Sequence, residues 1–173
     1  MIKMVASDLD GTLLIGGRQT LPEEIFPLVK ELKKMGILFV AASGRQYANM
    51  RNLFAPVKDE MAFISENGGL AVQNEKLLYC DSFDKELVRE IIQVIWEKPG
   101  AEFSCSTKDF YYIMPKTEHY RHLMIEEVKN QCKIIKSFDE ITEPCMKVAV
   151  YEREEDRKST RLNSSHHFIS YAV

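Results

Sequence analysis

The stretch VASDLDGTLL at residues 5–14 ends an apolar run with two aspartates, Asp8 and Asp10, that are separated by one residue. Residues 2–7 are short and mostly apolar, which predicts a buried strand. An ionised carboxylate that is buried without a partner costs several kcal/mol, and two carboxylates held close together also repel each other. The pair therefore needs a chemical reason to stand at the end of this strand.

The segments that follow alternate between helical and strand periodicity. Residues 20–23, Thr-Leu-Pro-Glu, fit a capping box, and the apolar positions behind them recur at helical spacing until Gly36. The run ILFVAA at residues 37–42 is continuous and apolar, as in parallel strands that are covered on both faces. We therefore expect this run and residues 2–7 to form central strands of one sheet.

Further predicted elements complete the first part of the chain. A polar helix is expected over residues 46–54, a short buried strand over residues 61–64, and a turn at residues 66–69, Glu-Asn-Gly-Gly. Strand, helix, strand, helix, strand is the order of a doubly wound, Rossmann-like α/β core with a parallel sheet. We assign residues 1–82 to the N-terminal part of such a core.

The pattern changes after about residue 83. The expected elements are a helix over 87–95, strands over 101–106 and 110–114, a helix over 120–128, and an alternating, half-buried strand over 146–151. This order predicts a separate α+β layer at residues 83–156. Residues 157–173, RKSTRLNSSHHFISYAV, have no sustained apolar period and resemble the adapter read-through found at the ends of some cloned reading frames. We interpret them as a non-native tail, and its two histidines as no metal site.

Composition excludes several classes of protein. The chain has 173 residues, of which 45% are hydrophobic, and a net charge of -3. This charge is too small and mixed to indicate nucleic-acid or membrane-surface binding, and no apolar run approaches the roughly 20 residues that cross a bilayer. The N-terminus lacks the features of a signal peptide. The cysteines are too widely spaced for a zinc site or a disulfide framework: Cys80, Cys105, Cys132 and Cys145. We expect a cytoplasmic globular protein, and the sequence leaves its oligomeric state open.

The two aspartates suggest metal and phosphate chemistry. In open α/β sheets, ligands bind outside the carboxyl ends of the strands, where Asp8, Asp10 and Ser43 would lie. Strand residues alternate between faces, so Asp8 and Asp10 share a side while Leu9 points into the core. Two such carboxylates can hold Mg²⁺. One can attack a phosphorus atom while the other donates and later accepts a proton.

Ser43 and Gly44 would complete a phosphate-binding site. The serine offers a hydroxyl, and Gly44 offers an unobstructed backbone N–H at the start of the next predicted helix, whose positive end favours a phosphate. A Ser-Gly turn before a helix is common, so this signal is weak by itself. A calcium loop is excluded by spacing, because Gly11 is the fourth residue from Asp8 and an EF-hand needs the sixth. A simple Asp10-Gly11 turn leaves the second aspartate unexplained.

Three motifs in this order resemble the haloacid dehalogenase-like superfamily of phosphohydrolases: DLDGTLL at residues 8–14, AASGR at 41–45 and SENGG at 65–69. The last motif and the α+β segment behind it resemble the Cof-like subgroup, whose type IIB cap domain is inserted after the third strand. The resemblance extends to about residue 156. It implies that residues 83–156 form a partial α+β cap.

The resemblance also implies a role for individual residues. Asp8 is similar to the nucleophile that forms an aspartyl-phosphate, and Asp10 to the general acid/base. Asp8 and the main-chain carbonyl of Asp10 would bind Mg²⁺, and Ser43 would hydrogen-bond the phosphoryl group. The residues that would shape the backbone around that group, or contribute nearby polar contacts, are Gly11, Thr12, Arg45 and Asn67.

Two features of the superfamily are missing from this sequence. One is a lysine that neutralises the nucleophile and the phosphate, since Lys147 and Lys158 stand in the wrong setting. The other is a downstream GDxxND-like segment that completes the metal site. The first interpretation is therefore a Mg²⁺-dependent phosphatase of small phosphorylated metabolites such as sugar phosphates, when complete. The alternatives are an inactive fragment or a phosphate- or metal-binding remnant, and a phosphomutase of the same superfamily.

Overall fold

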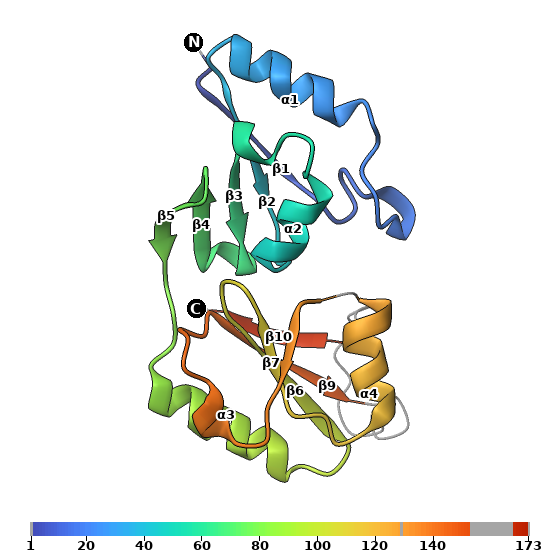
Figure 1. Cartoon of the computed structure of the whole chain (residues 1–173), viewed down its shortest axis with the longest axis vertical. Helices are drawn as coiled ribbons and strands as arrows, with labels where there is room; N and C mark the ends of the chain where they lie inside the picture. The colour runs from blue at the N-terminus through green and yellow to red at the C-terminus, as the bar shows by residue number, and fades with distance from the viewer. Residues whose placement is uncertain (1, 129, 153–167, 173) are drawn as a thin grey trace. The chain divides into compact units, whose positions relative to one another are not determined.

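The computed structural model describes residues 2–128, 130–152 and 168–172. The chain divides into two compact units, Met1–Asp81 and Ser82–Val173. Each unit has its own five-stranded sheet, and each is described by itself (Figure 1).

The first unit contains a sheet with the strand order β1-β2-β3-β4-β5. The first three strands are parallel, and β4 and β5 add an antiparallel hairpin. The strands are β1 (Met4–Asp8), β2 (Leu38–Ala42), β3 (Ala62–Ser65), β4 (Leu70–Gln73) and β5 (Lys76–Cys80). The helices are α1 (Ile25–Lys34) and α2 (Tyr47–Leu53), with single 3₁₀ turns at Ile15–Gly17, Lys58–Glu60 and Glu66–Gly68. The parallel part confirms the Rossmann-like class of fold.

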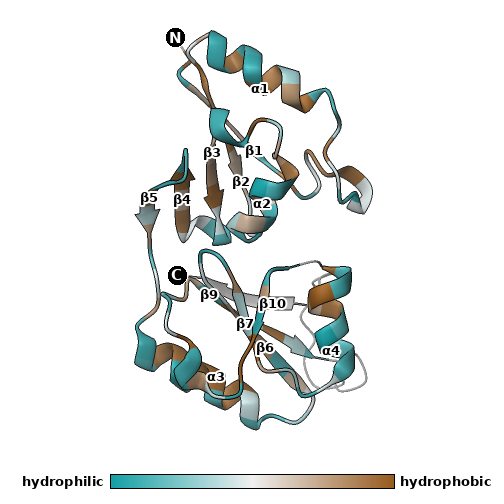
Figure 2. Cartoon of the chain, viewed as in Figure 1, coloured by the Kyte–Doolittle hydropathy of each residue, from teal (hydrophilic) through white to brown (hydrophobic). Residues whose placement is uncertain are grey.

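The core of the first unit is formed by the sheet together with α1 and α2, and Val29 is the buried residue of α1. Apolar residues dominate β2, β3 and β4, as Figure 2 shows. Phe54, just after α2, is fully buried, and its ring lies 6.0 Å from that of Phe63 on β3 in an edge-to-face arrangement. Burying large aromatic side chains on both elements gives the helix a fixed position against the sheet.

The first unit differs from the pattern expected from sequence at three places. The helix after the proposed capping box begins at Ile25, and the side chain of its N-cap residue, Glu24, makes no capping hydrogen bond. Among the described residues β1, a strand expected to have neighbours on both sides, pairs only with β2, and Met4 on it is 57% exposed. The β4–β5 hairpin was not predicted, because Asn74 and Glu75 form its turn with positive φ and no glycine marks it.

The second unit contains a sheet with the order β10-β9-β6-β7-β8, antiparallel except for the β7–β8 pair. Its strands are β6 (Ala101–Ser106), β7 (Tyr111–Ile113), β8 (Cys132–Ile134), β9 (Lys147–Glu152) and β10 (Phe168–Ala172). Its helices are α3 (Lys85–Glu97) and α4 (Glu118–His122), the latter continued by a π-helical turn at Leu123–Glu127, with a 3₁₀ turn at Phe138–Glu140.

Two apolar clusters form on opposite faces of this second sheet. Phe103 and Val148 pack with Ile92 of α3, whereas Ile113 and Tyr151 pack with Tyr120 of α4. Side chains alternate between the faces of a strand, so a helix on each side buries both sets. This α+β arrangement agrees with the expected layer.

Two expectations for the second unit are corrected. The strand at β9 is mostly buried rather than half-buried, because β6 and β10 flank it. The helix expected over residues 120–128 starts at Glu118 and changes to π geometry at Leu123. Of the stretch interpreted as a tail, residues 168–172 pair with β9, and residues 157–167 and 173 lie outside the described residues.

Candidate active site

The first two strands end side by side, and the predicted site residues follow them. Asp8 is the last residue of β1 and lies opposite Ala42, the last residue of β2, in a parallel register. Asp8 and Asp10 are exposed, while Leu9 between them is fully buried. Alternation along the chain thus directs both aspartates to one side and anchors the segment between them.

A tight turn holds the backbone after Asp10. The N–H groups of Thr12 and Leu14 both donate to the carbonyl of Leu9, at 3.2 and 2.7 Å. Gly11 has φ +82°, a left-handed conformation that L side chains adopt at a cost. Gly11 and Thr12 therefore shape this loop, and the Thr12 side chain is exposed.

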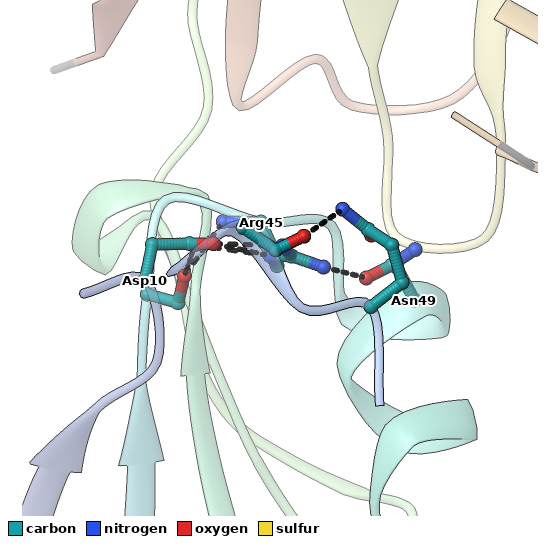
Figure 3. Close-up of polar contacts among 6 residues, drawn as sticks. Asp10, Arg45 and Asn49 are labelled. Carbon is teal, nitrogen blue, oxygen red and sulfur yellow. Dashed lines mark hydrogen bonds and ion pairs between the residues drawn. The ribbon is translucent and has the colours of Figure 1, made fainter. Parts of the chain in front are cut away.

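Asp10 is held by two residues from the loop after β2 (Figure 3). Arg45 donates from Nε to Asp10 Oδ2 at 2.9 Å and from Nη2 to Oδ1 at 2.7 Å, and the Ser43 hydroxyl lies 3.4 Å from Oδ2. Two guanidinium nitrogens facing two carboxylate oxygens fix both the position and the orientation of the acid. Among the described residues, by contrast, no hydrogen bond or ion pair engages the carboxylate of Asp8.

Asn49 extends this network and was missed in the sequence. Arg45 Nη1 donates to Asn49 Oδ1 at 3.2 Å, so the guanidinium is held from a second side by the first turn of α2 (Figure 3). A spacing of four residues at a predicted helix start was the available signal. The backbone N–H of Arg45 also donates to Ser43 Oγ at 3.2 Å, which orients that hydroxyl.

A third loop, after β3, is hydrogen-bonded to the loop after β2. The N–H of Glu66 donates to the carbonyl of Arg45 at 3.1 Å, and that of Asn67 to the carbonyl of Ser43 at 3.3 Å. Glu66 and Asn67 both have positive φ, at 53° and 58°. The side chain of Asn67 lies against Gly44: a Cβ at Gly44 would be 2.4 Å from Asn67 Oδ1.

The expected position of Gly44 is corrected by the structure. Gly44 does not start a helix, because α2 begins at Tyr47 after an extended Gln46, and α2 has only seven residues. The groups that could bind a phosphate here are accordingly the Ser43 hydroxyl, the Arg45 guanidinium and the loop backbone, rather than a helix terminus.

The oxygen ligands at this site are of the type that a hard divalent cation prefers, but they are too few to complete its coordination shell. Asp8 presents an exposed carboxylate, which is the ligand class that Mg²⁺ prefers. Within residues 2–128, 130–152 and 168–172, no three His, Cys, Asp or Glu side chains gather as a metal-binding group. Asp8 and the main-chain carbonyl of Asp10 can supply part of an octahedral shell, the remainder of which needs water or further ligands.

Several known proteins resemble this chain. A 5-amino-6-(5-phospho-D-ribitylamino)uracil phosphatase, YbjI of Escherichia coli, is 27% identical over 140 residues, which are 81% of this chain and 52% of that protein. A haloacid dehalogenase-like hydrolase from B. subtilis superposes with a TM-score of 0.71 at 20% identity, covering 89% of this chain and 63% of that one. A HAD subclass IIB sugar phosphatase, BT4131, superposes with a TM-score of 0.66 at 18% identity, covering 88% and 60%.

The chain thus spans about half the length of the Escherichia coli relative. No helix in the described part of the chain combines the length and apolarity needed to cross a bilayer. The family model for haloacid dehalogenase-like hydrolases matches residues 5–172, which include both units. With the Rossmann-like first unit and the α+β second unit, this match establishes that the chain belongs to the haloacid dehalogenase-like hydrolase family.

Proposed function

We propose that the protein is a Mg²⁺-dependent phosphatase of small phosphorylated metabolites that works through an aspartyl-phosphate on Asp8. The observation that carries this proposal is the difference between the two aspartates. Asp8 is exposed and its carboxylate is unengaged among the described residues, whereas Asp10 is held by Arg45 and Ser43. A nucleophile needs an accessible lone pair, and a general acid/base needs a fixed position.

The reaction divides between the two carboxylates. An oxygen of Asp8 attacks phosphorus and the bond from phosphorus to the leaving oxygen breaks. Asp10, in a protonated form in which one of its oxygens is released from Arg45, donates its proton to that leaving oxygen. Asp10 then accepts a proton from water, whose oxygen attacks the phosphorus of the aspartyl-phosphate. The bond between Asp8 and phosphorus breaks, and inorganic phosphate leaves with Asp8 restored.

The loop after β2 would bind the phosphoryl group. The Ser43 hydroxyl lies beside Asp10 and can turn to donate to a phosphoryl oxygen. The backbone at Gly44 is unobstructed by a side chain of its own, and the Arg45 guanidinium adds positive charge. Donors placed where negative charge develops account for a large part of the rate of phosphoryl transfer.

Mg²⁺ would be held by Asp8 and the main-chain carbonyl of Asp10, together with ligands outside these two. When bound, it offsets the charge of the phosphate and of the carboxylates. Asp8 then meets an anionic substrate without the full cost of repulsion.

The proposed substrates are small phosphate monoesters. The Escherichia coli relative is named for a phosphorylated ribitylamino-uracil, and BT4131 is described as a sugar phosphatase. Both names support a phosphorylated metabolite as the substrate class. We also propose a cytoplasmic site of action, because Cys80, Cys105, Cys132 and Cys145 are all free, as in a reducing compartment.

The test is hydrolysis of an aryl phosphate with and without Mg²⁺, in a form of the protein that also carries the superfamily's lysine and downstream carboxylates. We expect metal-dependent turnover that falls by on the order of a thousandfold or more in Asp8→Asn. Ser43→Ala should cost less, roughly ten- to a thousandfold, because it removes one donor. Retained turnover in Asp8→Asn would refute the assignment of the nucleophile, and transfer of the phosphoryl group back to an added sugar phosphate would favour a mutase.

A further inference from the structure

The backbone conformation at residue 44 does not explain why this residue is a glycine. Six glycines of the chain have positive φ, which favours glycine at those positions, but Gly44 is not among them. An alanine could therefore adopt the backbone of Gly44 without strain. What excludes a side chain is space, because a Cβ would lie 2.4 Å from Oδ1 and 3.3 Å from Cγ of Asn67.

Asn67 occupies that space from a strained turn. It has φ +58° and follows Glu66 at φ +53°, so two successive residues with side chains stand in the left-handed region. Such a conformation costs of order 1–2 kcal/mol for a residue other than glycine, and asparagine is among those that tolerate it best. Two consecutive cases persist only where the surrounding structure holds them.

The surrounding structure that holds them is the loop after β2. The N–H of Asn67 donates to the carbonyl of Ser43 at 3.3 Å, and the N–H of Glu66 donates to the carbonyl of Arg45 at 3.1 Å. These two bonds and the contact of the Asn67 amide with Gly44 engage three successive residues, Ser43 to Arg45. Glu66 itself is fully buried, and its burial anchors the turn in the first unit.

We propose that Asn67 is a positioning residue for the acid/base, acting through the Ser43–Arg45 loop rather than by touching the substrate. The side-chain amide of Asn67 lies against Gly44 and thereby fixes the position of the Ser43–Arg45 loop relative to β3. The loop in turn delivers the Ser43 hydroxyl and the Arg45 guanidinium to Asp10. That this positioning matters for catalysis rests on the proposed function, but the contact between Asn67 and the Ser43–Arg45 loop is a property of the fold.

The contact predicts a specific coupling between Gly44 and Asn67. The atom nearest to a new Cβ is the end of a side chain, so Gly44→Ala should displace the Asn67 amide and move the loop rather than unfold the unit. Asn67→Gly keeps the left-handed backbone and removes the amide. In the Asn67→Gly background, the three atoms nearest to the added methyl group at residue 44 are absent.

The test is a double-mutant cycle followed by ¹⁵N NMR on the 173-residue chain. The readouts are the Arg45 Nε–H resonance, which reports the bond to Asp10, and the backbone amide of Arg45, which reports the bond to Ser43 Oγ. We expect Gly44→Ala to shift both resonances and to accelerate Nε–H exchange by about tenfold or more, as for loss of about 1.4 kcal/mol of protection. The same substitution in the Asn67→Gly background should shift them by less than half as much.

A conservative variant separates positioning from folding. Asn67→Asp keeps the shape and the tolerance for positive φ, and should leave both Arg45 resonances close to those of the unchanged chain. Asn67→Ala should shift them. The proposal is overturned if Gly44→Ala leaves the Arg45 resonances in place, or if its effect is the same in both backgrounds. No step of this experiment requires turnover, so its outcome does not depend on phosphatase activity. Absence of turnover in the form that also carries the superfamily's lysine and downstream carboxylates would count against the proposed function alone.

Discussion

Arg45 and Asp10, which are 35 residues apart in sequence, form a two-point ion pair in which Nη2 lies 2.7 Å from Oδ1 and Nε lies 2.9 Å from Oδ2. The carboxylate is half exposed, so the pair adds about 1 kcal/mol or less to stability. Its importance is geometric. A planar fork holds a carboxylate in one orientation, which a single ammonium group does not.

Arg45→Lys should therefore reduce turnover much more than stability. In the active form of the protein, we expect kcat to fall about ten- to a hundredfold, because a misplaced acid/base costs that much, while the melting temperature changes little. Arg51→Lys is the matched control, since Arg51 lies on α2 and pairs with Glu75 away from Asp10. Equal kcat values in the two variants would contradict the role assigned to Arg45.

The β4–β5 turn carries a removable strain. Asn74 and Glu75 have φ 49° and 63°, the two left-handed residues of a tight hairpin for which Asn-Gly is the preferred sequence. We expect Glu75→Gly to raise the free energy of unfolding by about 0.5 kcal/mol, since relief of strain exceeds the lost ion pair with Arg51. Glu75→Ala keeps the strain and loses the pair, so it should be less stable than the unchanged chain. Urea unfolding measures both, and a Glu75→Gly chain less stable than Glu75→Ala would contradict this account.

The C-terminal end of α3 depends on a lysine from another element. Lys116 Nζ donates to the carbonyls of Trp96, Lys98 and Ala101 at 2.7, 3.0 and 2.8 Å, and lies 4.6 Å from the centre of the Trp96 ring. Burial lowers the pKa of Lys116, while Glu102 opposes that shift. We expect Lys116→Met to destabilise the second unit by about 1–3 kcal/mol, because three carbonyls lose their donor. Lys108→Met, at a half-buried lysine in the turn between β6 and β7, is the control, and similar thermal shifts in both variants would argue against this cap.

The stability of the second unit should fall in acid because of Glu143. Burial alone would raise the pKa of this carboxyl, but hydrogen bonds from Lys133, Thr107 and Tyr112 outweigh it and lower the pKa below its usual 4.5. A lowered pKa in the folded state means that this stabilisation is present above pH 4.5 and is lost as the pH falls through the folded-state value.

Glu143→Gln tests this dependence directly. At pH 7 we expect it to cost about 1–2 kcal/mol, since bonds to a charged acceptor become bonds to a neutral one. The difference from the unchanged chain should shrink as the pH falls below 4.5. Chemical unfolding at several pH values measures it, and a difference that is constant from pH 7 to pH 3 would show that the charge of Glu143 contributes nothing.

Mg²⁺ should bind weakly to the 173-residue chain. Among the described residues, Asp8 and the backbone of Asp10 offer too few ligands for an ion that dehydrates reluctantly. We expect a dissociation constant in the millimolar range, with roughly the affinity of a single exposed carboxylate site, and aryl-phosphate hydrolysis at background. Titration followed by amide resonances near Asp8, with Asp8→Asn as the control, measures the affinity. Micromolar binding or turnover that depends on Asp8 would show that the chain alone builds a complete site.

The amino-acid sequence by itself determined the order of most helices and strands and the class of fold. A short continuous apolar run such as residues 37–42 is typical of a strand in a covered sheet, and the apolar stripe at residues 87–95 is typical of a helix. These patterns are local, so the chain shows them without its neighbours. The sequence also placed two aspartates after the first strand and a serine after the second.

Tertiary structure decided what depends on contacts between distant residues. Whether a strand is central or at the edge of a sheet follows from its partners, and among the described residues β1 has only β2. The β4–β5 hairpin depends on left-handed residues that carry no glycine signal. Likewise, the ion pair of Arg45 with Asp10 and the contact of Asn67 with Gly44 form because three parallel strands place the loops that follow them side by side at the carboxyl end of the sheet. Periodicity records which face of an element is buried, and only the folded chain sets which side chains then meet.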